Sequence, residues 1–434
     1  SQEALRSAVP AAPDPERSAL PGMQDPGPRP MPEDGTTFQV DAVQPAGITA
    51  LPPEEVMALI ETFLSQPATR TAAEELRAGL QKAYRDRGMI FTRVNTPVLV
   101  GTRLVVEVVE ARIDAVEIAE PEGDVGEVRE LARRLAGPLV GLENPTLDEL
   151  ERVLLILNDV PGLTKATAVP SAGPGGPGSV LVTLNLVRDA VSGVAFANNR
   201  QQPSFGEGLA GVVGSYNSYT AAGDTTSVTL STSFWSEARD LIERNIVEVN
   251  HSRYVGDDGA RVGARVFASR SRPGDVLEIL ELEGNEVEIE LWGEYPVIRT
   301  RALSVWARGG AEYRDADLRL PGAPGAQIAD EDLRILYIEG QALIRDSYGY
   351  SDFALGLRHG IESMGSSRSG DPTNSRFDGE PGATVAYMRY ERDQILADKV
   401  TANLKMEGQF ASDPLMGSEE FALGNNTFGR GFDP

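Results

Sequence analysis

The C-terminal half of this chain is dominated by an alternation of apolar and polar residues. Between Glu286 and Leu291, glutamates alternate with Val, Ile and Leu, and the same period of two runs through Thr226–Phe234, Leu303–Arg314 and Val400–Phe410. Successive side chains of a β-strand point to opposite faces, so each segment has one apolar and one polar face. From about residue 189 the pattern predicts eleven strands, near residues 190–199, 207–218, 226–236, 243–254, 259–270, 286–296, 298–314, 331–348, 350–363, 380–393 and 396–412.

Two architectures fit such strands. A large soluble antiparallel sandwich or propeller would bury the apolar face against a second sheet, whereas a transmembrane β-barrel would turn it to lipid and the polar face to a wet lumen. Segments of 10–17 residues exceed the usual length of soluble strands, and a charged face suits water better than a packed core. Short connections near Pro296 and Gly349 also alternate with long ones such as Ser363–Glu380. The sequence therefore predicts an antiparallel transmembrane barrel over residues 189–434.

Composition excludes several classes of protein. No apolar run approaches the roughly 20 residues that a membrane-spanning helix needs. With 40 Lys and Arg against 65 Asp and Glu, the net charge is −25, which disfavours nucleic-acid phosphate as a partner. The chain has no cysteine, so disulfides, cysteine-ligated metals and thiol nucleophiles are excluded together.

Residues 37–111 combine strands with helical periodicity. Thr71 and Glu74 have the spacing of a capping box, which predicts a helix start at Thr71. The predicted elements are a strand at Phe38–Val43, helices from Pro53 and from Thr71 to Gly88, and strands at Ile90–Val94 and Arg103–Val109. Their order is β-α-α-β-β.

Residues 112–188 repeat this order. Thr146 and Glu149 form a second capping box before an apolar helical stripe. The predicted elements are a strand at Arg112–Ala119, helices over Val128–Leu135 and from Thr146 to Leu157, and strands at Leu163–Val169 and Val180–Val187. Two α+β units of about 75 residues each therefore stand in tandem ahead of the barrel.

Residues 1–36 contain eight prolines, which predict an extended tether. Only Gln2–Val9 has room for a short helix.

No pattern of catalytic chemistry is present. The only histidines, His251 and His359, lie over a hundred residues apart on predicted strands, where we expect polar residues of the lumen or rim rather than metal ligands. No G-x-S-x-G motif occurs, and Gly173–Gly178 is not followed by the Gly-Lys-Ser/Thr of a phosphate loop. We expect no enzyme activity, no catalytic residue, no metal and no cofactor.

Two tandem β-α-α-β-β units feeding a barrel resemble the outer-membrane transporters of two-partner secretion, of the haemolysin secretion/activation type, whose repeat units are POTRA domains. Asn158-Asp159-Val160-Pro161-Gly162-Leu163 and Tyr84–Gly88 are similar to recurrent phrases of that family. The resemblance covers residues 37–434. It implies two POTRA domains, at 37–111 and 112–188, and a barrel from residue 189.

The most specific part of the resemblance is the C-terminal motif. Ser418–Gly424, followed by Gly429, Arg430, Gly431 and Phe432, looks like the family's inward-folded sixth extracellular loop. Gly429 stands where the family usually has Val or Ile. The resemblance implies that this loop lies in the lumen, with Arg430 paired to a carboxylate of the barrel wall.

The resemblance further implies a function. The protein would lie in the outer membrane, with residues 1–188 in the periplasm, and would export a large unfolded exoprotein with an N-terminal secretion domain. A sheet edge in a POTRA domain can accept an extended client by β-augmentation. Candidate docking residues are Ile90, Thr92 and Val94 in one unit and Leu163, Ala166 and Val169 in the other. We expect a monomer. The alternatives are an assembly insertase of the same superfamily and a non-transporting porin or adhesin.

Two features depart from the family pattern. Eleven antiparallel strands do not close a bacterial barrel, whose strand number is even, so we expect this sequence to lack about five final strands. The family often has an N-terminal plug helix in the pore. Here the prolines of residues 1–36 leave room for a vestige of it at most.

Overall fold

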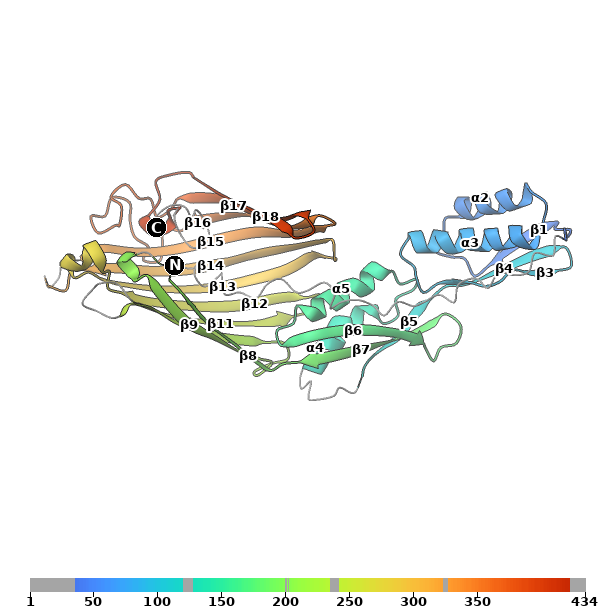
Figure 1. Cartoon of the computed structure of the whole chain (residues 1–434), viewed down its shortest axis with the longest axis horizontal. Helices are drawn as coiled ribbons and strands as arrows, with labels where there is room; N and C mark the ends of the chain where they lie inside the picture. Colours follow the sequence, from blue (N-terminus) through green and yellow to red (C-terminus); the bar gives the residue numbers. More distant parts are fainter. Residues whose placement is uncertain are drawn as a thin grey trace. The chain divides into compact units, whose positions relative to one another are not determined.

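The computed structural model describes residues 36–119, 128–199, 201, 203–234, 242–322 and 327–421. The expected tether, the short helix at Gln2–Val9 and the motif Gly429–Phe432 lie outside the described residues. Within them the chain divides at Arg188 into two compact units, an α/β unit and a second unit that begins at Asp189 (Figure 1).

The first α/β domain is built around one central strand. Its elements are β1 (Ala42–Ala46), α2 (Pro53–Leu64), α3 (Arg70–Asp86), β2 (Arg93–Val94), β3 (Val98–Val100) and β4 (Arg103–Val109). Strand β4 pairs in parallel with β1 and antiparallel with β2 and β3. Phe63, Leu80 and Tyr84 of the helices are buried against this sheet. Helices on one side of a small sheet thus enclose the apolar core.

Local details of this domain differ from the prediction. Helix α3 begins one residue earlier than expected, because Thr69 rather than Thr71 caps it by accepting a hydrogen bond from the Ala72 N–H. The first strand begins at Ala42 rather than Phe38. Strand β3 was not predicted, and its three residues are too few to show a period.

The second α/β domain repeats the arrangement with β5 (Arg112–Ile118), α4 (Val128–Ala136), α5 (Leu147–Asn158), β6 (Leu163–Ala172) and β7 (Ser179–Arg188). The sheet order is β5-β7-β6, so β6 is an edge strand. Thr146 and Glu149 form the expected capping box at the start of α5. Pro170 lies in β6, where an edge position tolerates its missing N–H.

The second unit is a single sheet of eleven antiparallel strands, the number that the alternation predicted. The strands are β8 (Val191–Asn198), β9 (Gly208–Asn217), β10 (Thr225–Phe234), β11 (Ile242–Val255), β12 (Ala260–Ser271), β13 (Glu283–Arg299), β14 (Leu303–Arg319), β15 (Gln327–Asp346), β16 (Gly349–Gly360), β17 (Thr384–Ala397) and β18 (Val400–Ala411). They pair in sequence order, and within the described residues β8 and β18 are the two edges.

One predicted turn in this sheet is wrong. The expected boundary near Pro296 lies inside β13, where an irregularity in the pairing between Pro296 and Ile298 accommodates the proline. The chain turns instead at residues 300–302. Short connections of two to four residues also join β11 to β12, β15 to β16 and β17 to β18, and the long connection 361–383 joins β16 to β17 at the opposite end of the strands.

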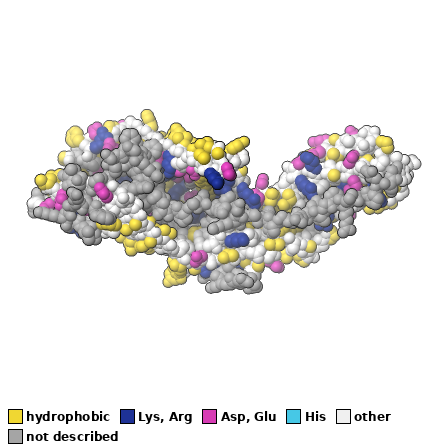
Figure 2. Space-filling model, in the orientation of Figure 1, with side chains coloured by type: hydrophobic (Ala, Val, Ile, Leu, Met, Phe, Trp, Pro, Cys, Tyr) yellow, Lys and Arg dark blue, Asp and Glu magenta, His cyan; other side chains and the backbone are white. Residues whose placement is uncertain are grey.

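The two faces of the sheet have opposite character. Leu291, Ile338 and Leu355 are more than half exposed on one side, which we call the apolar face. Glu288, Glu312 and Arg314 are buried on the other side, the polar face. Figure 2 shows hydrophobic side chains at the surface of this unit. In the described part of the chain, no helix is long and apolar enough to cross a membrane.

Candidate functional site: the polar face and the domain edges

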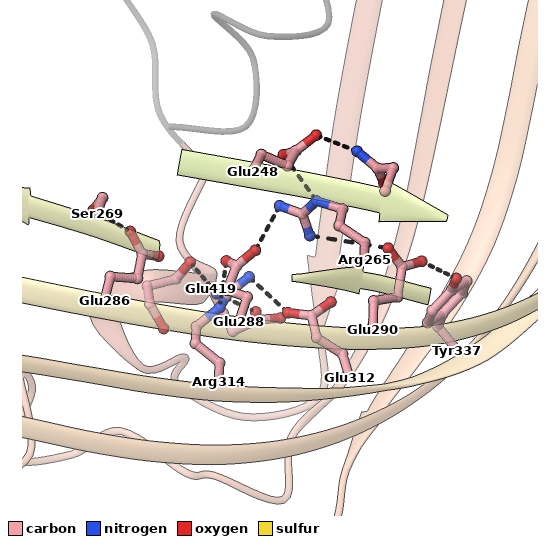
Figure 3. A network of polar contacts seen from close by, with 12 residues as sticks. Glu248, Arg265, Ser269, Glu286, Glu288, Glu290, Glu312, Arg314, Tyr337 and Glu419 are labelled. Carbon is pink, nitrogen blue, oxygen red and sulfur yellow. Dashed lines mark hydrogen bonds and ion pairs between the residues drawn. The ribbon is translucent and has the colours of Figure 1, made fainter. Parts of the chain in front are cut away.

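Ion pairs link four neighbouring strands, β11 to β14, across the polar face (Figure 3). Arg265 of β12 contacts Glu248 of β11 at 3.0 Å and Glu288 of β13 at 2.8 Å. Arg314 of β14 pairs with Glu288 at 2.9 Å and Glu312 at 2.8 Å. Glutamates of β11 and β13 thus face arginines of β12 and β14, so each of these four charges has an opposite neighbour.

The network reaches the segment that follows β18. Glu419 lies 2.9 Å from Arg314 and 3.1 Å from Arg358 of β16, which also pairs with Glu312 at 3.2 Å. Arg314 and Glu312 are each only 6% exposed. Because a buried charge that loses its partner is costly, such a network fixes position more than it adds stability.

Aromatic rings cover glycines on the same face. A Cβ at Gly356 would lie 2.3 Å from the Tyr387 ring, and one at Gly310 would lie 3.0 Å from the ring of Tyr337. The hydroxyl of Tyr387 donates to Glu339 over 2.8 Å, and that of Tyr337 donates to Glu290. Each tyrosine thus reaches across a glycine to a carboxylate two strands away, which ties neighbouring strands into one wall.

The two histidines lie on different strands, and each contacts a threonine hydroxyl. His251 contacts the hydroxyl of Thr226 and His359 that of Thr384, each at 2.9 Å on the neighbouring strand. The described residues contain no group of three or more His, Asp and Glu side chains able to hold a metal.

The predicted docking residues occupy two different settings. Ile90 and Thr92 precede the two-residue strand β2, of which Val94 is the last residue, whereas Leu163, Ala166 and Val169 all lie in the ten-residue edge strand β6. Among the six, only Ile90 and Val169 are exposed. The longer of the two edges is therefore that of β6.

Both edges carry a helix-borne amide. The side chain of Gln81 in α3 donates to the Thr92 carbonyl and accepts from the Val94 N–H, both over 2.9 Å. The side chain of Asn158, the last residue of α5, donates to the Ala166 carbonyl over 3.0 Å and accepts from the Ala166 N–H over 2.9 Å. We call these two contacts the amide clamps. Each supplies one donor and one acceptor to an edge strand.

The two short motifs Asn158–Leu163 and Tyr84–Gly88, on which part of the resemblance rests, therefore have structural roles. Asn158 opens the first phrase and joins α5 to β6 through its clamp, and Gly162 in the same phrase turns with a φ of +82°. In the second, Gly88 ends α3 with a φ of +77°, and its carbonyl accepts from the Leu147 N–H of the next domain over 2.9 Å. Such positive φ angles favour glycine.

Glu110 joins the two α/β domains. One carboxylate oxygen accepts from the N–H groups of Thr49 and Ala50 and from the Tyr84 hydroxyl, at 2.6–2.9 Å. The other accepts from the Thr49 hydroxyl and, over 3.2 Å, from Asn144 of the second domain. Burial raises the pKa of Glu110, but the hydrogen bonds from Thr49, Tyr84 and Ala50 outweigh it and lower the pKa to about 2.

Sequence reasoning did not single out Glu419, Gln81, Asn158 or Glu110 for these contacts. Glu419 meets Arg314 across 105 residues of chain, and no local spacing encodes such a pairing. The available signal was the presence of both charge signs at alternate positions of adjacent strands. Of the predicted loop motif, Gly429, Arg430, Gly431 and Phe432 lie outside the described residues.

Comparison with known proteins agrees with this architecture. The family model for a POTRA domain of the ShlB type matches residues 38–110. The heme/hemopexin transporter protein HuxB of Haemophilus influenzae strain 86-028NP is 21% identical over 391 residues, which are 87% of this chain and 66% of that protein. HuxB of strain KW20/Rd is 20% identical over the same span. The match thus covers slightly less than two thirds of these relatives' length.

Two solved structures share the fold. CdiB from Escherichia coli superposes with a TM-score of 0.72 at 19% identity, covering 96% of this chain and 76% of that one. CdiB from Acinetobacter baumannii gives a TM-score of 0.61 at 14% identity, with 100% and 78% covered. Residues 38–110 therefore match a POTRA domain of the ShlB type, and the chain as a whole shares the fold of the two CdiB structures.

Proposed function

We propose that this protein exports one or a few large unfolded exoproteins from the periplasm to the cell surface by two-partner secretion. The observation that carries the proposal is a ShlB-type POTRA domain ahead of an antiparallel sheet with one apolar and one charged face. An apolar face suits lipid, and a face of paired charges suits a wet passage for an unfolded chain. The protein lies in the outer membrane with its POTRA domains in the periplasm.

The client binds first at a POTRA sheet edge. The client's N-terminal secretion domain presents an extended segment, and an edge strand pairs with it through main-chain hydrogen bonds. The geometry favours β6 over β2, because β6 has ten residues and its Val169 is 41% exposed. Since Asn158 occupies both main-chain groups of Ala166, a client that pairs at that residue has to displace the clamp.

Arg430 then holds the loop that it belongs to inside the lumen. Its flanking glycines, Gly429 and Gly431, allow a tight turn, and Phe432 supplies an apolar neighbour. A guanidinium grips a carboxylate bidentately, so lysine substitutes poorly. Arg430→Ala is expected to reduce secretion sharply at unchanged outer-membrane abundance. Normal secretion by this variant would exclude the role.

The proposal needs no catalytic step and no cofactor. The partners are the client and the lipid bilayer, and we expect the transporter to act as a monomer, because a barrel that one chain closes needs no partner. Outward folding of the client gives the transport its direction.

A comparison of cell-surface proteins with and without this transporter tests the function. We expect one or a few very large proteins to disappear from the surface while other outer-membrane proteins keep their abundance. A general loss of outer-membrane proteins would indicate an insertase. No loss, accompanied by a change in ion conductance, would indicate a porin.

A further inference from the structure

The segment Pro414–Glu420, which follows β18, lies against the polar face and buries two apolar side chains there. Leu415 is 9% and Met416 1% exposed. Met416 packs on Leu333 and Ile335 of β15, and Leu415 packs beside Val385 of β17. We call this segment the latch, and the apolar residues beneath it the socket.

The socket is an exception to the alternation of the sheet. Leu333 and Ile335 lie on the same face of β15 as Glu331 and Glu339, because every second residue of a strand points to the same face. An apolar side chain gains nothing from a wet passage, but it gains from contact with Leu415 and Met416. The apolar side chains of the socket therefore favour the conformation in which the latch is bound to them.

Glu419 fixes the other end of the latch. Arg314 donates to the Ser418 carbonyl over 3.0 Å and to the Glu419 carboxylate over 2.9 Å. Arg358 donates to the same carboxylate over 3.1 Å, and Gln409 of β18 donates to the Glu419 carbonyl over 2.8 Å. Three strands thus hold one residue.

The connection 361–383 covers the latch from another direction. The Gly417 N–H donates to the Ser375 hydroxyl over 2.8 Å, and the Glu380 N–H donates to the Pro414 carbonyl over 2.8 Å. Arg376 of the same connection pairs with Glu420, and both side chains are substantially exposed.

We propose that Glu419 is a positioning residue that holds the latch against the barrel wall and thereby narrows the pore. The proposal rests on the proposed function in treating the polar face as the wall of a pore. Its contacts involve only described residues and are independent of Arg430. Loss of the Glu419 carboxylate leaves Arg314 paired with Glu288 and Glu312, and Arg358 paired with Glu312. The wall therefore keeps its ion pairs, while the latch loses the contacts of its one largely buried carboxylate with Arg314 and Arg358.

The test uses Glu419→Ala and, as a matched control, Glu420→Ala, which removes the neighbouring but exposed carboxylate. Cells that express each variant in the outer membrane are exposed to vancomycin, which intact outer membranes exclude by size. We expect Glu419→Ala to lower the inhibitory concentration several-fold and Glu420→Ala to leave it at the wild-type value.

A disulfide tests whether displacement of the latch, rather than damage to the barrel wall, causes the sensitivity to vancomycin. A Cβ at Gly417 would lie 3.2 Å from that of Ser375, slightly closer than the roughly 3.5–4.5 Å between the Cβ atoms of bridged cysteines. The chain has no cysteine of its own that could compete for the bridge. Gly417→Cys with Ser375→Cys, added to Glu419→Ala, is expected to restore exclusion of vancomycin when oxidised and to lose it again in a membrane-permeant reductant.

Two results would overturn the proposal. One is an unchanged vancomycin sensitivity of Glu419→Ala at wild-type abundance. The other is a sensitivity that persists after the disulfide has formed. Secretion of the client is measured separately, in cells with and without the transporter. If secretion does not depend on the protein, the proposed function fails, whereas the vancomycin results still decide whether the latch narrows a pore.

Discussion

The first α/β domain and the eleven-stranded sheet bury opposite kinds of side chain. In the domain, Tyr84 and Leu80 are at most 1% exposed. In the sheet, Leu291 is 60% exposed and Glu288 only 1%. The same chain therefore follows two burial rules, one on each side of Arg188.

The difference shows that a side chain is placed according to the solvent outside its own unit. Water around the α/β domain drives apolar groups to the centre. In the outer-membrane location that we propose, lipid around the sheet removes that drive, so charged groups can gather on the polar face if they are paired. Stability in the domain comes from apolar packing, whereas position in the sheet comes from paired charge. Substitutions that remove a buried charge from the sheet or a buried apolar side chain from the domain test this contrast.

The largest effect is expected at Arg314. Arg314→Ala removes an arginine that pairs with three carboxylates, those of Glu288, Glu312 and Glu419. Loss of a buried partner of this kind lowers the free energy of unfolding by about 3–5 kcal/mol. We expect the folded band in unheated SDS gels to disappear at a lower temperature than for the wild type. The matched control is Arg270→Ala, whose side chain is 59% exposed beside Glu283 and whose loss costs at most about 1 kcal/mol. Equal behaviour of the two variants would contradict the role of the network.

A comparable but slightly smaller effect is expected for Leu80→Ala in the fragment 37–188. We expect this fragment to fold alone and to melt cooperatively in circular dichroism. Leu80 is 1% exposed, so the cavity left by its truncation lowers the free energy of unfolding by about 2–5 kcal/mol. Leu291→Ala removes the same atoms from a side chain that is 60% exposed on the apolar face of the sheet, and it should leave heat resistance nearly unchanged. Similar losses in both units would erase the distinction between them.

Asn158→Ala should cost less. Ala166 is fully buried, and its main-chain groups lose both partners, which costs about 1–3 kcal/mol. Urea unfolding of the fragment measures this loss. If the client docks at β6, its N-terminal segment should bind the variant more tightly, since no clamp has to be displaced. Gln81→Ala opens the β2 edge instead and is expected to leave client binding unchanged.

The smallest effect concerns pH. The pKa of Glu110 is about 2 in the folded domain and about 4.5 in the unfolded chain, so the unfolded chain takes up the proton first as pH falls. The stabilisation from Glu110 is therefore complete above about pH 4.5 and declines as pH falls towards 2. The urea midpoint of the fragment should fall over this window. Glu110→Gln should reduce that dependence, and an unaltered pH profile would show that other groups dominate it.

The sequence predicted those features that repeat or are local. Eleven strands follow from a period sustained over more than two hundred residues, and Thr146 with Glu149 marks a helix start within four residues. The Thr71 capping box was wrong because Thr69 offered an equivalent hydroxyl two residues earlier. The contacts of Glu419, Gln81 and Asn158 form with residues that only the fold brings close. Neither composition nor local spacing predicts such contacts.

The amide clamps affect which extended chains can pair with the edges of the two α/β domains. A sheet edge with free main-chain groups would pair with any passing extended chain, including another copy of the same domain. A side-chain amide satisfies the edge with one donor and one acceptor, which are the groups that a visiting strand would bring. Replacing it exchanges two hydrogen bonds for two, so the edge is shielded from chance contacts yet can be opened without a net loss of hydrogen bonds. Selection among visitors then depends on the further contacts that each one makes along the strand.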